Sequence, residues 1–597
     1  MVKPIAAIIP DAAPVMLGVT RSLSGRQWLA RAYDERIALA LQQRFGLTDL
    51  AGRCMAGRGV SLEQAADYLQ PTLRSLLPNP SVLQAMDIAA ARLVAAVQAQ
   101  EEVTIFGDYD VDGGTATALL VRFLRYCGLK TRIYIPDRMT EGYGPNAVAM
   151  DRIAAMGAKL VTCVDCGTTA HEPLRRAKEL GLDVVVFDHH AAEPALPPCL
   201  ALVNPNRLDD ISGLGSLCAA GVTFLAIVAV NRALRQAGFF TAERPEPDLL
   251  QWLDLVALGT VADVVPLVGL NRALVSQGLK QMARTSNAGL AALLQVGRAQ
   301  LPPDAFTAGF ILGPRVNAGG RVGGADLGAR LLSCDDADEA MALAVQLDAL
   351  NAQRKDVEAE VLAAAEYQAQ QADDVPFLLI AGEGWHPGVI GIVASRLKDK
   401  YHRPCFVIGL DGTMGKGSGR SVRGLDLGAM VIAARQAGLL INGGGHAMAA
   451  GLTVAREHVT ALKEFFIERT EKFIAASPIV PSLTLDGLLS GVAATPDLLT
   501  ELERLKPYGT SNSEPRFALP SCQIGRADVV GEKHVRVFFS CGGTRLGGIA
   551  FRALETAVGA ALLQAKGRPL HLAGYLRADT WNGRNGVQLQ IEDAAWA

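Results

Sequence analysis

Between residues 103 and 190, short apolar runs rich in β-branched residues alternate with stretches whose apolar positions recur at helical spacing. The runs read VTIF, TRIYI, KLVTCV and DVVVF, and glycines close several of the helical stretches between them. This rhythm predicts an α/β fold with a doubly wound parallel sheet. Ligands of such sheets bind beyond the carboxyl ends of the strands, so chemistry is expected just after each apolar run.

The pattern changes twice further along the chain. Residues 335–372 contain neither Gly nor Pro and predict one long helix, which is either an ordinary packed helix or a rigid connector. An α/β pattern then resumes until a Pro-containing stretch at 475–482, beyond which alternating runs such as HVRVFFSC predict a small β-barrel. The expected domains are 1–334 (N-terminal region and catalytic sheet domain), 335–372 (connecting helix), 373–475 (smaller α/β domain) and 480–597 (β-barrel of OB type).

Composition narrows the class of protein. A chain of 597 residues is too long for one core, and a formal net charge of −3 excludes a histone-like blanket of positive charge. Ten scattered cysteines and a Pro-broken N-terminus favour a protein of the reducing cytoplasm. The longest charge-free stretch, 211–231, begins too rich in Gly and Ser for a membrane span, so we expect a buried helix and no membrane.

Acidic residues and histidines follow four of the apolar runs. Asp108, Asp110 and Asp112 alternate along FGDYDVDGG, so an extended chain places all three carboxylates on one side. Singly, such residues are ordinary helix caps or polar residues. Together we expect them at one edge of the sheet, where the others are Asp165, Asp188, His189, His190 and, after a Gly-Thr turn, Asp263.

Five or six carboxylates in one place repel each other at a cost of several kcal/mol unless a cation joins them. Oxygen-rich ligands with one or two imidazoles favour Mn²⁺ or Mg²⁺ over zinc. Cys163 and Cys166 lack the second cysteine pair of a zinc site, so we interpret them as buried packing residues. The surplus of carboxylates predicts two ions, which suit hydrolysis of a phosphodiester or phosphoanhydride.

The motifs DYDVDG, VDCG, DHH and GTVADVVP, in this order, resemble those of the DHH phosphoesterases. GGGHAMAAG (443–451) resembles the glycine-rich motif of their companion DHHA1 domain, and GPRVNAGGR, GWHPGVIGIVASRL, GSGRS and KPYGTSNSEPRF extend the match over most of residues 80–597. Within the family, the pattern is similar to that of bacterial exonucleases specific for single-stranded DNA. The resemblance implies 5′ to 3′ release of mononucleotides, in DNA recombination and repair.

The resemblance also implies roles for the acidic cluster. The implied metal ligands are Asp110, Asp112, Asp165, His189 and Asp263. Asp165 is expected to bridge two ions, with Asp108 beside them. Asp188 is expected to orient His189 by a hydrogen bond, and His190 to face the scissile phosphate. Many DHH proteins carry a further His near the position of Phe106, so the number of resting metal ions stays open here.

Substrate contacts are expected in five further segments. Ser418 and Arg420, with Arg138, resemble an anchor for a 5′-terminal phosphate, although a solvated turn is the alternative. Arg315 and Arg321 are expected along the path of the strand. Gly444, Gly445 and His446 are expected to bind an inner phosphate, with a tight structural turn as the alternative. In the barrel, Phe538, Phe539, Phe551, Tyr575 and Trp581 are either base-stacking or core residues.

Two other functions stay open. One is a DHH/DHHA1 oligoribonuclease or cyclic-dinucleotide phosphodiesterase, relatives that generally lack the OB-like domain. The other is a DNA-binding scaffold with a decayed site, which the intact ligand motifs oppose. The exonuclease interpretation implies single-stranded DNA as substrate, cooperation with a single-strand-binding protein and a DNA helicase, and a monomer.

Overall fold

The computed structural model describes residues 13–137, 141–372, 375–476, 480–565, 567–579 and 586–597. The chain forms two compact units. Unit 1 comprises Met1–Ser75, Leu267–Gly269 and Val480–Ala597, and unit 2 comprises Leu76–Pro266 and Leu270–Ile479.

The first α/β domain of unit 2 is built on a five-stranded parallel sheet, in the order β3-β2-β4-β5-β6. The four apolar runs form its first four strands, which confirms the predicted fold class, and a short fifth strand follows at the edge. Strand order reverses between β2 and β4, the point where doubly wound sheets bind ligands. The strands are β2 (Val103–Phe106), β3 (Thr131–Tyr134), β4 (Leu160–Val164), β5 (Asp183–Phe187) and β6 (Ala201–Val203).

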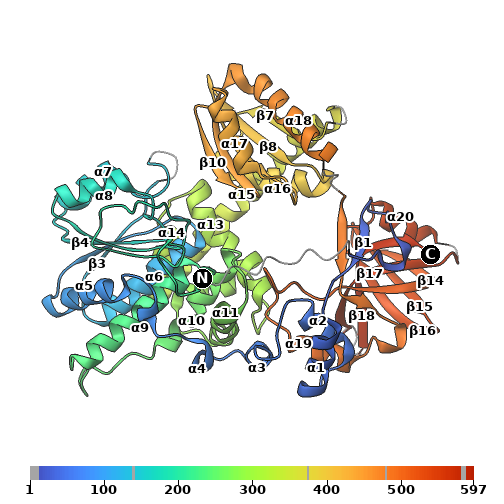
Figure 1. Cartoon of the computed structure of the whole chain (residues 1–597), viewed down its shortest axis with the longest axis horizontal. Coiled ribbons are helices and arrows are strands. Elements are labelled where there is room, and N and C mark those ends of the chain that lie inside the picture. Colours follow the sequence, from blue (N-terminus) through green and yellow to red (C-terminus); the bar gives the residue numbers. More distant parts are fainter. Residues whose placement is uncertain (1–12, 138–140, 373–374, 477–479, 566, 580–585) are drawn as a thin grey trace. The chain divides into compact units, whose positions relative to one another are not determined.

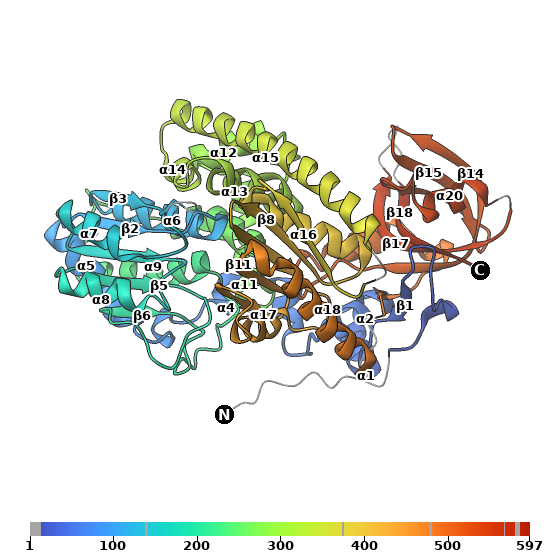
Figure 2. The same cartoon turned by 90° about the horizontal axis from the view of Figure 1, so that it is seen from above.

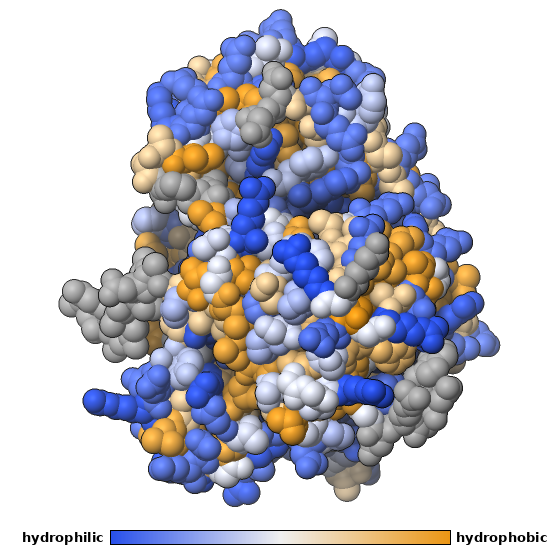
Figure 3. Space-filling view, turned by 90° about the vertical axis from the view of Figure 1, so that its right-hand side faces the viewer, coloured by the Kyte–Doolittle hydropathy of each residue, from blue (hydrophilic) through white to orange (hydrophobic). Residues whose placement is uncertain are grey.

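Helices cover both faces of this sheet. α7 (Ala147–Ala155) and α8 (His171–Glu179) lie on one face, and α5 (Met86–Ala99) and α9 (Ala219–Gln236) on the other (Figure 1). α9 contains most of the charge-free stretch and is largely buried, as predicted. Among the described helices, no single one has the length and apolarity of a span, but the pair Leu73–Val82 and Met86–Ala99, bent by 85°, passes that test together. Apolar and polar side chains are interspersed on the face drawn in Figure 3.

One expected element is different. The sequence predicts a Gly-Thr turn at the sheet edge in the run from Leu253 to Asp263, but Leu253–Ala262 is helix α10, and Gly259 and Thr260 lie inside it. Gly259 suits this place because a Cβ there would lie 2.8 Å from the Cβ of Ala220 on α9. The domain's other helices are α6 (Val111–Tyr126), α11 (Gly269–Met282), α12 (Ala288–Val296), the π-helical η4 (Thr307–Leu312), α13 (Gly313–Val322) and α14 (Leu327–Ser333).

The predicted connecting helix is α15, Ala337–Gln371, which runs unbroken for 35 residues (Figure 2). The Asp336 side chain caps its first turn by accepting a hydrogen bond from the Glu339 N–H. α15 packs on α12, α13 and α14 and also on α16 and β7 of the next domain. It is therefore both a packed helix and the connector between the two α/β domains.

The second α/β domain has a five-stranded mixed sheet in the order β10-β11-β9-β8-β7. Only β7 and β8 pair in parallel, and the other neighbours are antiparallel. Its elements are β7 (Leu378–Glu383), α16 (Pro387–Tyr401), β8 (Cys405–Asp411), β9 (Met414–Arg420), α17 (Leu427–Gln436), β10 (Asn442–His446), β11 (Ala449–Ala455) and α18 (Val459–Ala476).

Unit 1 contains the predicted β-barrel. Its five long strands close because β14 pairs with both β15 and β17, while β16 and β17 both pair with β18. The strands are β13 (Gly487–Leu488), β14 (Phe517–Val530), β15 (His534–Cys541), β16 (Thr544–Ala550), β17 (Leu570–Asp579) and β18 (Gly586–Trp596), with helices α19 (Pro496–Glu503) and α20 (Ala557–Gln564).

The N-terminal segment belongs to the same compact unit as the barrel, whereas the sequence pattern groups it with the catalytic domain. β1 (Gln27–Ala30) pairs in parallel with β12 (Ser482–Leu485), and Trp28 is fully buried against the barrel. Leu41 and Met55 share a core with barrel residues such as Phe517. The segment's helices are α1 (Glu35–Phe45), α2 (Asp49–Ala56), α3 (Ala65–Leu69) and α4 (Leu73–Leu76).

Candidate metal centre

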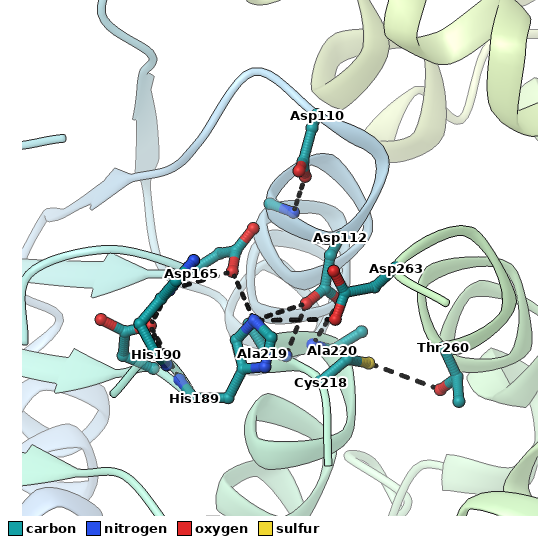
Figure 4. Close-up of polar contacts among 12 residues, drawn as sticks. Asp110, Asp112, Asp165, His189, His190, Cys218, Ala219, Ala220, Thr260 and Asp263 are labelled. Carbon is teal, nitrogen blue, oxygen red and sulfur yellow. Dashed lines mark hydrogen bonds and ion pairs between the residues drawn. The ribbon is translucent and has the colours of Figure 1, made fainter. Parts of the chain in front are cut away.

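The acidic residues and histidines converge at the carboxyl ends of β2, β4 and β5, beside the point where strand order reverses (Figure 4). Asp108 and Asp110 follow β2, Asp165 follows β4, and the Asp188–His190 segment follows β5. Asp263 reaches the cluster from the end of α10, where it is the C-cap residue. The topology therefore brings together residues that are up to 155 positions apart in the chain.

Helix ends hold two of these carboxylates in place. Asp110 is the N-cap of α6, and its Oδ1 accepts a hydrogen bond from the Gly113 N–H at 3.0 Å. Asp112, in the first turn of α6, is buried and accepts hydrogen bonds from the first two amides of α9, Ala219 at 2.6 Å and Ala220 at 2.9 Å. The positive end of the α9 dipole thus faces the Asp112 carboxylate and favours its charged form, but burial outweighs this effect and raises the pKa of Asp112.

Asp165 occupies a strained position directly after β4. Its φ is +60°, in the left-handed region that non-glycine residues rarely adopt, and its N–H donates to the Phe187 carbonyl. The residue is only 2% exposed. Strain of this kind at a buried carboxylate indicates a position that the surrounding structure fixes for a reason other than stability.

His189 lies at the centre of the cluster. Its Nε2 is 3.2 Å from Asp165 Oδ1 and 3.7 Å from carboxylate oxygens of both Asp112 and Asp263. Three overlapping groups have ligand atoms within 4.8 Å of one another: Asp112–His189–Asp263, Asp108–Asp110–Asp165 and Asp165–His189–His190. All five expected ligands therefore meet, together with Asp108 and His190.

Asp188 contacts a different ring from the one expected. Its Oδ1 lies 2.7 Å from His190 Nδ1 and accepts the backbone N–H groups of both His189 and His190. Its Oδ2 accepts the Thr168 N–H at 3.0 Å. Asp188 thus orients the His190 ring directly and contacts His189 only through the backbone, because the loop turns the His189 ring toward the carboxylates.

Burial and mutual repulsion shift the pKa values of the cluster. Burial, and then the neighbouring carboxylates Asp112, Asp110 and Asp108, raise the pKa of Asp165 well above its usual range. The same kinds of cause raise the pKa of Asp263 to about 8. Burial lowers the pKa of His190, but the Asp188 hydrogen bond and charge outweigh it and raise the value to about 9. Without further positive charge, the described residues cannot keep all these carboxylates ionised.

The residues fit divalent cations. Asp165 Oδ1 and Asp263 Oδ2 are buried and accept no hydrogen bond from any residue that the structure describes. Buried acceptors without donors carry a large desolvation cost unless a cation or proton satisfies them. Oxygen atoms with one or two imidazole nitrogens suit Mn²⁺ or Mg²⁺. Cys163 and Cys166 are buried, as predicted for packing residues.

Sequence reasoning missed three polar residues that border the cluster. The Tyr143 hydroxyl donates to the Asp165 carbonyl at 3.1 Å and lies 3.3 Å from His190 Nε2. Asn204 and Asn206 donate to the backbone carbonyls of His190 and His189. The available signal was their position, because Tyr143 lies in the loop after β3 and both asparagines follow β6, at the same sheet edge.

Ser418 and Arg420 lie together on β9, in the interior of the second sheet, and not in a solvated turn. An Arg420 guanidinium nitrogen donates to Ser418 Oγ at 3.3 Å and to the Gly419 carbonyl at 2.9 Å. Helix α16 packs on β9, and Gly391 of this helix leaves room for both side chains, because a Cβ there would lie 2.9 Å from Ser418 Oγ. Arg138 lies outside the described residues.

The remaining expected contacts divide into two kinds. Arg315 pairs with Asp348 at 2.9 Å and caps the Ile311 carbonyl, and Arg321 donates to the Gly388 carbonyl at 2.8 Å. Both guanidinium groups therefore have structural partners. Gly444, Gly445 and His446 instead lie on the exposed edge strand β10.

Comparisons with known proteins agree with this arrangement. The DHH family N-terminal domain matches residues 102–260, the DHHA1 domain matches 374–472, and the RecJ OB domain matches 485–593. The chain is 38% identical to the single-stranded-DNA-specific exonuclease RecJ of Dickeya dadantii, over 92% of this chain and 96% of the relative.

The fold is similar to solved structures of RecJ from Thermus thermophilus. The structure in complex with Mn²⁺ has a TM-score of 0.78 and 32% identity, over 95% of this chain and 78% of that one. The structure in complex with Mg²⁺ has a TM-score of 0.74 and 29% identity, over 96% and 78%. Sequence identity across nearly the whole chain, the three domain matches and the shared fold agree, and the chain therefore belongs to the RecJ family of DHH phosphoesterases.

Proposed function

We propose that the chain is an exonuclease that degrades single-stranded DNA from the 5′ end and releases mononucleotides, in DNA recombination and repair. The observation that carries this proposal is the buried cluster of carboxylates around His189, whose charge the described residues leave uncompensated. Membership of the RecJ family supports DNA as the substrate, since the relatives are named as single-stranded-DNA-specific exonucleases.

Two divalent ions, Mn²⁺ or Mg²⁺, fit the cluster as cofactors. We assign one to Asp112, His189 and Asp263 and the other to Asp108, Asp110 and Asp165, with Asp165 near enough to His189 to serve both. When bound, such ions supply a water of lowered pKa and neutralise charge on the phosphate oxygens. The protein's part is to hold the carboxylates ionised and converging.

His190 is assigned to the scissile phosphate. Asp188 holds its Nδ1; burial lowers the pKa of the imidazole, but the Asp188 hydrogen bond and charge outweigh it in the metal-free protein and favour the protonated form. The His190 side chain is 43% exposed; Asp188 holds its Nδ1 edge, and its Nε2 lies 3.3 Å from the Tyr143 hydroxyl. A protonated imidazole in this position stabilises a phosphate or gives a proton to the leaving oxygen.

The direction of degradation is assigned to Ser418 and Arg420 together with Arg138. Burial lowers the pKa of Arg420, and no carboxylate pairs with its guanidinium group in the part of the chain that the structure describes. Such an arginine favours a dianionic 5′-terminal phosphate. Arg315, Arg321, Gly444, Gly445 and His446 are assigned to the path of the strand, with Arg315 and Arg321 acting through the segments that they support.

We further infer a monomer in the cytoplasm, working with a single-strand-binding protein and a DNA helicase. Family membership and the proposed chemistry support these assignments, because an exonuclease specific for single strands needs a source of unpaired DNA.

End-labelled strands test the proposal. Purified protein is incubated with 5′-labelled and 3′-labelled single strands of two to about thirty nucleotides, with Mn²⁺ or with Mg²⁺. We expect labelled mononucleotides at once from 5′-labelled long strands and only late from 3′-labelled ones, with duplexes resistant. Preference for dinucleotides would favour the rival oligoribonuclease or cyclic-dinucleotide phosphodiesterase, against which the match to the RecJ OB domain argues.

A further inference from the structure

The loop that carries His189 and His190 runs beside the loop that follows β6. β5 and β6 pair in parallel with Phe187 opposite Val203, and the Asp188 N–H donates to the Val203 carbonyl at 3.1 Å. Asn204 therefore begins its loop level with Asp188. The two loops leave adjacent strands at the same edge of the sheet, so side chains of one can reach the backbone of the other.

Asn204 is fully buried, and its carboxamide uses both ends. Its Nδ2 donates to the His190 carbonyl and to Thr168 Oγ1, each at 2.8 Å, and its Oδ1 accepts the Asn206 N–H at 2.7 Å. Thr168 in turn donates its N–H to Asp188. The hydrogen bonds of the Asn204 side chain thus hold the His190 backbone, Thr168 and Asn206 in place.

Asn206 makes the equivalent contact to His189, the residue before His190. Its Nδ2 donates to the His189 carbonyl at 2.5 Å and to the Gly215 carbonyl at 3.2 Å. Gly215 precedes α9, whose first amides hold Asp112. Asn206 therefore connects the backbone of His189 to the segment that positions Asp112. His189 and Asp112 both belong to the ligand group that includes Asp263.

These contacts complete a clamp on the two histidines. Asp188 accepts the N–H groups of His189 and His190, and the two asparagines donate to the carbonyls of the same residues. With both polar groups of each residue fixed, the backbone dihedrals are fixed, and so is the direction in which each ring leaves the chain. Ligand and catalytic groups need placement to within about 0.5 Å, which such supporting hydrogen bonds provide.

We propose that Asn204 and Asn206 are positioning residues of the metal centre, with Asn206 setting the place of His189 at the Asp112–Asp263 ion and Asn204 setting the place of His190. The inference rests on the proposed function for the role of His190, but its metal-binding half does not require that the substrate be DNA. Outer-shell partners of metal ligands typically change affinity or activity about 10–100-fold when removed.

The first test is a Mn²⁺ titration of the full chain by calorimetry, without DNA. Asn206→Asp is nearly isosteric and replaces the amide donor by a charge that repels the His189 carbonyl. We expect its Mn²⁺ dissociation constant to rise about 10–100-fold. The matched control is Asn287→Asp, which keeps the helix-capping acceptor for Leu290 but loses a buried donor to the Leu332 carbonyl, away from the cluster. This control should bind Mn²⁺ within about twofold of wild type.

A glycine gives an independent variant. A Cβ on Gly215 would lie 2.6 Å from Asn206 Oδ1, so Gly215→Ala displaces the carboxamide without changing it. We expect weaker Mn²⁺ binding in the same direction as Asn206→Asp. If Asn206→Asp fails to fold, as a thermal melt reports, Gly215→Ala carries the test.

The second test separates Asn204 from Asn206. Asn204→Ala should lower kcat on single-stranded DNA about tenfold or more, with KM changed less than about threefold and Mn²⁺ affinity changed less than in Asn206→Asp, because Asn204 contacts the His190 backbone directly and His189 only through Asn206. Wild-type Mn²⁺ affinity in Asn206→Asp and Gly215→Ala, with melting temperatures lowered as in Asn287→Asp, would overturn the inference and leave a merely structural role. If wild type binds Mn²⁺ but leaves DNA intact, the proposed function fails while the clamp on His189 stands.

Discussion

Each unit of the protein contains a buried cluster of charged side chains, and the two clusters differ in whether their charges are paired. In unit 1, Asp486 Oδ1 accepts hydrogen bonds from both Arg58 and Arg31 at 2.8 Å, and its Oδ2 accepts the Arg516 N–H. The side chains of Arg58 and Asp486 are only 2% and 1% exposed. In unit 2, Asp112, Asp165 and Asp263 surround the His189 imidazole, with no arginine or lysine paired to them among the described residues.

The pKa values reflect this difference. In unit 1, burial lowers the pKa of Arg58, but the Asp486 charge and hydrogen bond outweigh burial and raise it. In unit 2, burial and neighbouring carboxylates act together and raise the pKa of Asp165. The first cluster pairs its charges within the fold, whereas the second lacks counter-charges and can receive a charge from outside. Each of the following changes tests one side of that contrast.

Removing the shared carboxylate of the uncompensated cluster should have the largest effect. We expect Asp165→Ala to abolish hydrolysis of single-stranded DNA, by more than about 1000-fold, because this residue belongs to two of the overlapping ligand groups. The chain should stay folded, as circular dichroism will report. Retention of a tenth or more of wild-type turnover at saturating metal would rule out the bridging role.

Breaking the compensated cluster should cost stability and leave metal binding unchanged. Arg58→Met leaves Asp486 buried with one cation fewer, and loss of one partner of a buried ion pair costs about 3–5 kcal/mol. Chemical denaturation followed by circular dichroism measures this loss. The increase in melting temperature on adding Mn²⁺ should equal that of wild type. If this increase disappeared in the variant, the two clusters would not be independent and the contrast between them would fail.

The metal-free protein should lose stability as pH rises. The folded-state pKa of Asp263, about 8, and of His190, about 9, lie above their unfolded values, so the folded state binds protons more tightly. Stability is therefore greatest below the unfolded values, falls as pH rises above them, and stops falling once the pH exceeds the folded values. Between pH 5 and 7, a single such group lowers the free energy of unfolding by up to about 2.7 kcal/mol.

Melts in a chelating buffer over this range measure the effect. Saturating Mn²⁺ should flatten the dependence, because bound cations replace the protons. Metal-free stability that increases from pH 5 to 7 would contradict the raised pKa values.

The smallest change is expected at the second sheet. Arg420→Ala should reduce discrimination between 5′-phosphate and 5′-hydroxyl strands by about 1.5–3 kcal/mol, the range for hydrogen bonds to charged groups. Competition between the two strands measures it, with exposed Arg469→Ala on α18 as the control. Equal losses of activity on both strands would assign Arg420 to another position along the path of the DNA strand.

Much of the fold could be predicted because local patterns encode it. VTIF, DVVVF and the Gly-free stretch before residue 372 became β2, β5 and α15, since apolar periodicity and helix breakers act over a few residues. The prediction for 253–263 was wrong because Gly and Thr resemble a turn, whereas packing of α10 against α9 favours the helix. The place of the N-terminal segment depends on the pairing of Gln27 with Ser482, which no local pattern contains.

The site was predictable in its residues and less so in its contacts. Charged residues directly after apolar runs are a local signal, so the seven residues of the ligand groups were found. Which ring Asp188 contacts depends on how a single loop turns, and the backbone of that loop accepts hydrogen bonds from Asn204 and Asn206 in another loop. Asparagines that follow a short strand are typical of an ordinary turn. Asn204 and Asn206 have the same sequence context as asparagines in such a turn, so the sequence alone does not mark them as contacts of the histidine loop.

The most direct test of the central claim is the melting temperature of Asp165→Asn beside wild type, with and without Mn²⁺. The substitution preserves shape and removes one buried carboxyl group whose pKa is raised by burial and by neighbouring carboxylates. We predict that the metal-free variant is at least as stable as wild type and that Mn²⁺ raises its melting temperature much less than that of wild type. A variant that is less stable without metal, and that Mn²⁺ stabilises as strongly as wild type, would contradict the account.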